Sequence, residues 1–223
     1  MLGICGGAAA QVGVPPPENV LQLTVSGTVE VQQDLLSLTL TTTHEGADAN
    51  VVQAQLKAAL DAALAEARKA AQPGQLDLRT GNFALYPRYE QKGNRISGWR
   101  GTAELVLQGR DFPRITQTAA RIQTMTLGGV SFGLSREQRA KVEGEAQAIA
   151  IERFKAKAAE LARSFGFSGY GLREVSVNSN DQGFIPRMRL AEAAQAPGVG
   201  MPVPVEAGKS AVTVTLSGSV QLR

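Results

Sequence analysis

The stretch LQLTVSGTVEV, residues 21–31, places apolar side chains at every odd position except Gly27 and polar side chains at every even position. A two-residue period of this length predicts a β-strand with one face on a core and the other in water, as in an antiparallel sheet. Gly27 interrupts the apolar face, which indicates a bulge or the close approach of another backbone. After a turn at Gln33-Asp34, alternating leucines at 36–40 predict a second strand.

Two segments have the four-residue spacing of amphipathic helices. The first follows Asp48, whose carboxylate can accept N–H groups of the first turn, and its apolar positions over 52–64 precede a stop at Gln72-Pro73-Gly74. The second opens at Ser135-Arg136-Glu137-Gln138 and stops at Gly166. Its opening predicts a capping box, in which the serine hydroxyl and the glutamine side chain satisfy each other's end of the first turn.

The remaining apolar patterns predict further strands and one short helix. The strands are expected at residues 76–89, 96–107, 130–134, 172–178 and 212–222. In the first of them the apolar side chains change from one parity of positions to the other near Gly81. A hairpin turn is expected at Lys92-Gly93-Asn94 and a short helix after Asp111. The sequence therefore predicts an α+β fold of two fused sandwiches, each a largely antiparallel sheet backed by helices. The second half has the plait-like order β-α-β-α-β-β.

This pattern also predicts how the chain is divided. Residues 1–10 form a truncated segment like a signal peptide, 11–19 a proline-rich spacer, 20–100 a first α+β subdomain and 101–223 a second one. The second subdomain contains an irregular loop at 181–209 that is rich in proline and glycine. Loops of this length in a compact domain are usually functional or disordered.

Composition argues against several kinds of chemistry. There is one cysteine and one histidine in 223 residues, so no disulfide framework and no histidine- or cysteine-rich metal site is expected. The 23 basic and 20 acidic residues are interleaved, and the net charge of +3 gives no strong field for nucleic acid. No phosphate-binding glycine motif occurs, and no run approaches the roughly 18 apolar residues that a membrane helix needs. We expect no cofactor, no metal and no transmembrane segment.

The first ten residues suggest export. Leu2 to Ala10 is a short run of apolar and small residues that resembles the end of a secretory signal peptide, with Ala8 and Ala10 as the small residues of the cleavage site. The basic and most of the apolar portion of such a peptide are absent from the sequence, so the segment is expected to be truncated. The alternative is an N-terminal tag without function.

Two groups of side chains form a candidate interaction surface. Aromatic and guanidinium groups gather around one predicted hairpin at Tyr86, Arg88, Tyr89, Trp99 and Arg100. The long irregular loop adds apolar and charged groups at Phe184, Arg187, Met188 and Arg189. Tyrosine, tryptophan and arginine are enriched in protein interfaces, so contact with a second copy of the chain or with another exported protein is expected.

Several segments together resemble the SIMPL-domain family, whose bacterial members include periplasmic immunogenic proteins and an oxidative-stress-associated periplasmic protein. The matching segments are Leu23 to Gly27, Gly81 to Tyr89, Ile96 to Gly101 and Val130 to Ser135. This resemblance implies export to the periplasm or outer envelope, an α+β fold and a tendency to form homo-oligomers. It carries over no catalytic residue. Trp99 stands where the family more often has tyrosine.

Two other functions remain as alternatives. The aromatic and arginine side chains of the hairpin could stack on and clamp a single-stranded nucleic acid, since plait-like modules bind RNA in this way. A hydrolase would have to use His44, which lies in the run Thr41 to Glu45 with few other catalytic groups near it. The sequence favours a non-catalytic exported protein that acts by homo-oligomeric assembly or protein binding, with a role in envelope or oxidative stress tolerance implied only by the resemblance.

Overall fold

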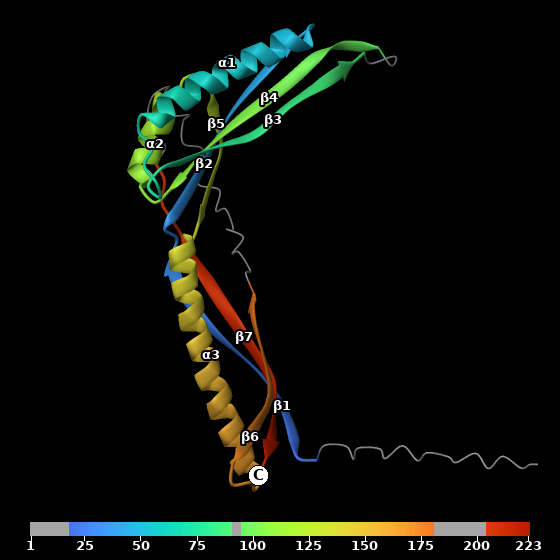
Figure 1. The fold of residues 1–223 in the computed structure, drawn as a ribbon, viewed down its shortest axis with the longest axis vertical. Coiled ribbons are helices and arrows are strands. Elements are labelled where there is room, and N and C mark those ends of the chain that lie inside the picture. The colour runs from blue at the N-terminus through green and yellow to red at the C-terminus, as the bar shows by residue number, and fades with distance from the viewer. Residues whose placement is uncertain (1–17, 91–94, 181–203) are drawn as a thin grey trace, which may run out of the picture. The chain divides into compact units, whose positions relative to one another are not determined.

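The computed structural model describes residues 18–90, 95–180 and 204–223, which fall into two compact units (Figure 1). One unit holds residues 18–28, 145–180 and 213–223, and the other holds 29–90, 95–144 and 204–212. The elements in chain order are β1 (Val20–Gln32), β2 (Leu35–Gly46), α1 (Ala49–Arg68), β3 (Asp77–Tyr89), β4 (Ile96–Gly109), α2 (Phe112–Arg121), β5 (Thr126–Gly133), α3 (Arg136–Ser164), β6 (Tyr170–Asn180) and β7 (Lys209–Leu222).

The first unit is a three-stranded antiparallel sheet with α3 against one face (Figure 1). The strand order is β1-β7-β6, so the last strand of the chain lies in the centre. The alternation predicted from the sequence puts Leu21, Leu23 and Val25 of β1 on the helix side. They pack there with the buried side chains of Leu216, Val220 and Leu222 from β7 and Ala150, Phe154, Ala158 and Ala162 from α3.

Gly27 allows α3 to lie close to this sheet. A Cβ atom at Gly27 would stand 2.1 Å from the carbonyl oxygen of Ala146 and 2.7 Å from the backbone nitrogen of Ala150. No side chain can occupy that space, since real Cβ atoms do not approach backbone atoms so closely. The close backbone approach predicted from the interrupted apolar face is therefore confirmed.

The second unit is a four-stranded antiparallel sheet in the order β3-β4-β2-β5. Helices α1 and α2 pack on the same side of it. Their buried side chains meet the alternating leucines of β2 and β4, and the core consists of Leu36, Leu38, Leu40, Leu60, Ala63, Ala67, Leu76, Leu105, Leu107, Ile115, Ile122 and Met125. The pairing of β3 with β4 shifts between Thr80 and Phe83, which confirms the parity change predicted near Gly81.

The helix caps agree with the sequence in part. Asp48 caps α1 by accepting from the backbone nitrogens of Asn50 at 2.7 Å and Val51 at 3.3 Å, as predicted. At α3 the Ser135 hydroxyl oxygen accepts from the Gln138 backbone nitrogen at 3.2 Å. The second hydrogen bond of the predicted capping box, from the Ser135 backbone N–H to the Gln138 side chain, is wrong. That N–H donates to the Asp34 carboxylate instead.

Asp34 takes that place because the turn between β1 and β2 brings its carboxylate to the start of α3. Its two oxygens accept from the Ser135 backbone nitrogen at 2.7 Å and from the Ser135 hydroxyl at 2.6 Å. Arg110 adds an ion pair, with Nε 3.5 Å from Asp34 Oδ2. A carboxylate makes stronger hydrogen bonds than a neutral amide, so the Ser135 backbone N–H binds Asp34 rather than the Gln138 side chain.

The α+β fold class is confirmed. The order β-α-β-α-β-β holds from β4 to β7, but β4 and β5 belong to one sheet and β6 and β7 to the other, so these strands do not form a single plait. The two units interleave along the chain, whereas the sequence placed one boundary between 100 and 101. Periodicity identifies strands without identifying their partners, which is the reason for the difference. The N-terminal segments 1–10 and most of 11–19, the hairpin turn and most of 181–209 lie outside the described residues.

Candidate functional site

The first unit has a polar sheet face on the side away from α3. Because side chains alternate along a strand, the positions between the core residues of β1, β7 and β6 all lie on this face. They are Gln22, Thr24, Ser26 and Thr28 on β1, Thr213, Thr215, Ser217, Ser219 and Gln221 on β7, and Glu174, Ser176 and Asn178 on β6. These positions carry hydroxyl and amide groups and one carboxylate, and the Arg173 guanidinium donates to Gln221 Oε1 at 3.1 Å.

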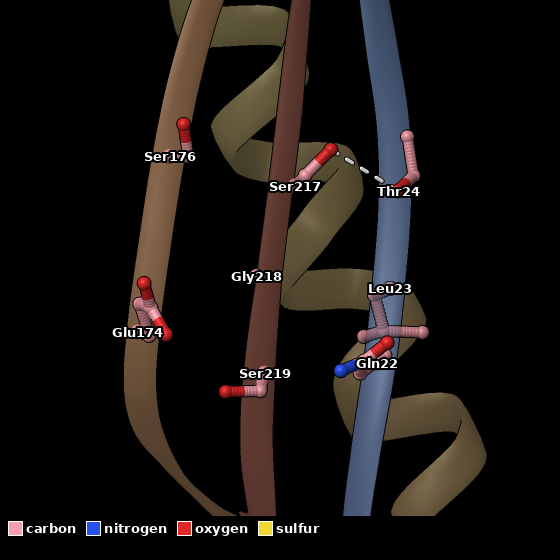
Figure 2. A pocket seen from close by; sticks show the side chains of 8 residues that line it. All are labelled: Gln22, Leu23, Thr24, Glu174, Ser176, Ser217, Gly218 and Ser219. Atoms are coloured by element: carbon pink, nitrogen blue, oxygen red, sulfur yellow. Dashed lines mark hydrogen bonds between the residues drawn. The ribbon is translucent and has the colours of Figure 1, made fainter.

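A shallow hollow of about 250 Å³ lies on this face (Figure 2). Two rows of side chains cross the three strands there, with α3 behind the sheet. The upper row is Thr24, Ser217 and Ser176, in which the hydroxyl oxygens of Thr24 and Ser217 are 3.1 Å apart, and the lower row is Gln22, Ser219 and Glu174. The lining groups donate and accept hydrogen bonds but place no histidine or second carboxylate beside a hydroxyl. The hollow is therefore suited to polar contact rather than to acid–base chemistry.

Sequence reasoning missed this hollow. The alternation of residues 22–28 predicts only that the even positions lie on the solvent side of a strand. That all of them are short and uncharged was visible, but the strands that complete the hollow are almost 200 residues apart along the chain. Only the sheet order brings Thr24 beside Ser217.

The hairpin of β3 and β4 brings three of the predicted interaction residues together. Tyr86 pairs with Arg100, and Arg100 pairs with Glu45 of β2, so these side chains share the face away from α1. The Arg88 guanidinium donates to one oxygen of Glu45, and Arg100 Nε is 3.6 Å from the other. This cluster combines an exposed aromatic ring with two guanidinium groups held in position by one carboxylate.

Trp99 lies on the opposite face of the same hairpin. It is half-buried and packs with Leu85 against Val52, Leu56 and Ala103, under α1. Tyr89 is exposed where β3 ends, paired with Ile96. The predicted interaction residues of the loop, Phe184, Arg187, Met188 and Arg189, lie outside the described residues.

His44 is half-buried on β2, opposite Gly101 of β4. Over the described ranges, no hydrogen bond or ion pair of its side chain is found, and no group of three or more histidine, cysteine, aspartate and glutamate side chains is placed to hold a metal. The carboxylate of Asp48 is used as a helix cap, and that of Glu104 accepts from the Asn82 backbone nitrogen at 3.1 Å. These carboxylates therefore have structural partners.

A second hollow, between the end of α1 and α2, is basic. Its lining includes Lys69, Arg114 and Arg121 together with Asp111. The Arg114 side chain donates from Nε to Asp111 at 2.9 Å, and the Arg114 backbone nitrogen donates at 3.0 Å. These two hydrogen bonds from Arg114, the side-chain bond more than the backbone bond, hold the pKa of Asp111 below its ordinary value. Asp111 thus stays ionised as the cap of α2 rather than acting as an acid.

A comparison with known protein families shows to which family the chain belongs. The model of the SIMPL family, described as a protein of unknown function (DUF541), matches residues 21–220. The chain belongs to the SIMPL family. The match runs from the first strand to the last and so includes both sheets, which confirms the resemblance drawn from the sequence segments. In the part that the structure describes, no helix of this SIMPL protein is long and apolar enough to cross a membrane.

Other comparisons add little. No curated protein matches this SIMPL protein. Among solved structures, the crystal structure of AtUAH in complex with glyoxylate is similar at 13% identity and a TM-score of 0.26, over 55% of this chain and 34% of that one. The chain thus spans about a third of the length of that protein. A TM-score this low does not establish a common fold.

Proposed function

We propose that this SIMPL protein is a non-catalytic, exported protein of the bacterial cell envelope that acts by homo-oligomeric assembly or protein binding. The periplasm or outer envelope is the proposed compartment, and tolerance of envelope or oxidative stress the proposed setting. Membership of the SIMPL family supports both the compartment and the setting, because the resemblance to that family implies them. The polar hollow and the structural use of the carboxylates support a role in binding.

The observation that carries the proposal is where the exposed apolar side chains lie. Eleven large apolar side chains are exposed in the described residues. Eight of them are on strands at the edge of a sheet: Phe83, Tyr86 and Tyr89 on β3, Leu127 and Val130 on β5, and Leu172, Val175 and Val177 on β6. An edge strand also presents unpaired backbone N–H and C=O groups. Apolar side chains beside such groups form the kind of surface to which another strand adds.

The first prediction concerns mass in solution. Light scattering at micromolar concentration should give a mass well above the 23.5 kDa of one chain. Tyr86→Ser should weaken the association about tenfold, because an exposed tyrosine at a protein contact commonly contributes more than about 1 kcal/mol.

Phe165→Ser is the matched control. Phe165 is 62% exposed and Tyr86 59%, but Phe165 follows α3 and lies on no strand. The control should leave the mass unchanged. A monodisperse monomer in the wild type at high concentration would contradict the proposal.

Binding of single-stranded nucleic acid is the second candidate, and one observation favours it. Tyr86, Arg88 and Arg100 share one open sheet face. Two phosphate contacts would make the affinity for an oligothymidylate fall about sevenfold between 50 and 200 mM salt, and Arg88→Ala would reduce that slope. We expect no binding with this salt dependence, because Glu45 already neutralises part of the charge of both guanidinium groups. Fluorescence anisotropy with a labelled oligonucleotide distinguishes the two outcomes.

A further inference from the structure

Strand β6 is the edge of the first unit's sheet that α3 leaves uncovered. Its apolar side chains face the same side as α3, because Leu172 pairs with Val220, Val175 with Gly218 and Val177 with Leu216. Yet Leu172 is 63% exposed, Val175 37% and Val177 46%. The equivalent side chains of the other edge, on β1, are half-buried against α3. The sheet thus has one covered and one open edge.

The open edge has both requirements for receiving another strand. Its outer backbone groups have no partner strand among the described residues, and a row of apolar side chains runs beside them. Edge strands of this kind are usually blunted by charge, proline or a bulge in the middle. In β6 the bulge lies at Leu172–Glu174, and the only charged side chains, Arg173 and Glu174, are beside it. Residues 175–179 remain free of these protective features.

We propose that two copies of this protein pair through residues 174–178 of β6, antiparallel about a two-fold axis at Ser176. This inference rests on the homo-oligomerisation proposed above and names one of the edge strands that take part in it. In this register Val175 of one copy lies opposite Val177 of the other, and Glu174 lies opposite Asn178. The pairing joins the two three-stranded sheets into one continuous sheet of six strands. A contact between two identical edges closes on itself, as two-fold interfaces do.

The other symmetric registers are worse. An axis at Val175 places Arg173 opposite Val177, and an axis at Glu174 places two carboxylates directly opposite each other. Like charges opposite each other destabilise a strand pair, whereas β-branched pairs stabilise it. An axis at Val177 leaves Val175 opposite Ser179. Only the axis at Ser176 gives both valines an apolar partner and keeps the two Glu174 side chains apart.

Cysteine cross-linking tests this register. In a Cys5→Ser background, Ser176→Cys should form a disulfide-linked dimer under mild oxidation, because directly opposed residues of an antiparallel pair have Cα atoms about 4.5–5.5 Å apart. Asn178→Cys is the matched control, since Asn178 is exposed on the same face and the same strand. Its two copies would be offset by four residues, about 13 Å along the strand, and should not cross-link.

A mixture sharpens the test. Glu174→Cys and Asn178→Cys proteins should cross-link with each other but neither with itself. Val177→Lys should lower the cross-link yield of the Ser176→Cys protein about tenfold, because an ammonium group would then lie opposite Val175. Non-reducing electrophoresis measures each yield.

The outcomes separate this inference from the proposed function. If wild-type protein is oligomeric by light scattering but Ser176→Cys cross-links no better than Asn178→Cys, pairing through β6 is overturned and homo-oligomerisation stands. If wild-type protein is a monomer, both are overturned. Cross-linking confined to Ser176→Cys and to the mixed pair supports both.

Discussion

Gly27→Val is expected to lower the free energy of unfolding of the first unit by about 3 kcal/mol or more, which is the upper end of the range for overpacked cores. The added Cβ would meet two backbone atoms of α3, the Ala146 carbonyl oxygen and the Ala150 nitrogen, at 2.1 and 2.7 Å. A flexible side chain could move aside, but helix backbone cannot. The helix would have to separate from β1. Urea unfolding followed by far-UV circular dichroism measures the change.

Gly144→Ala is the control for this substitution. Gly144 is exposed on α3, and an added Cβ would meet nothing within 4 Å. Alanine is preferred over glycine inside a helix by about 0.5–1 kcal/mol, so this variant should be as stable as the wild type or slightly more stable. If Gly27→Val were as stable as Gly144→Ala, the close packing of α3 on β1 would be wrong.

Much of this fold was predictable because its elements have strong local patterns. Gly27 was recognisable as a place of close approach because it is the only gap in an otherwise regular apolar face. Gly81 was recognisable as a register change because the apolar parity differs on its two sides, and the pairing of β3 with β4 shifts there. In both cases the sequence feature and its structural cause lie within one strand. Such local features need no knowledge of the partner strand.

The polar hollow and the open edge could not be predicted, because both depend on which strands are neighbours. β7 lies between β1 and β6, so Thr24 and Ser217 become neighbours although 193 residues separate them. The same order makes β6 an edge, and the position of α3 then decides that Val175 and Val177 stay exposed. The alternation of apolar and polar residues in β6 predicts neither fact, because the same alternation occurs in a strand that a helix covers and in one that it leaves exposed.

The candidate surface at the hairpin shows the same limit. Tyr86 and Arg100 share a face because β3 and β4 pair in a particular register. Trp99 belongs to the opposite face, where it packs under α1 with Ala103. An aromatic residue near an interface cluster in the sequence can thus belong to the core. Substitution of Trp99 would therefore disturb packing as well as any contact with a partner.

The second large effect is expected at Phe154. The buried face of α3 in the first unit is otherwise made of alanines at positions 146, 150, 158 and 162, so Phe154 is its one large buried side chain. Its ring lies over the centre of the sheet at Gly218, where an added Cβ would stand 3.3 Å from Phe154 Cζ. Small side chains around it cannot expand to fill a space left by the ring. Phe154→Ala should thus lower the free energy of unfolding by about 3–5 kcal/mol.

Phe165→Ala provides the comparison for Phe154→Ala, because it removes the same group from an exposed position of the same unit and should change stability by less than about 0.5 kcal/mol. Far-UV circular dichroism follows both units, whereas the fluorescence of Trp99, the only tryptophan, follows the second. The loss in Phe154→Ala should therefore appear in the dichroism transition. Since β6 has its place in the sheet that Phe154 supports, this variant should also lose the Ser176→Cys cross-link. A stable Phe154→Ala protein would contradict the packing of α3 on β7.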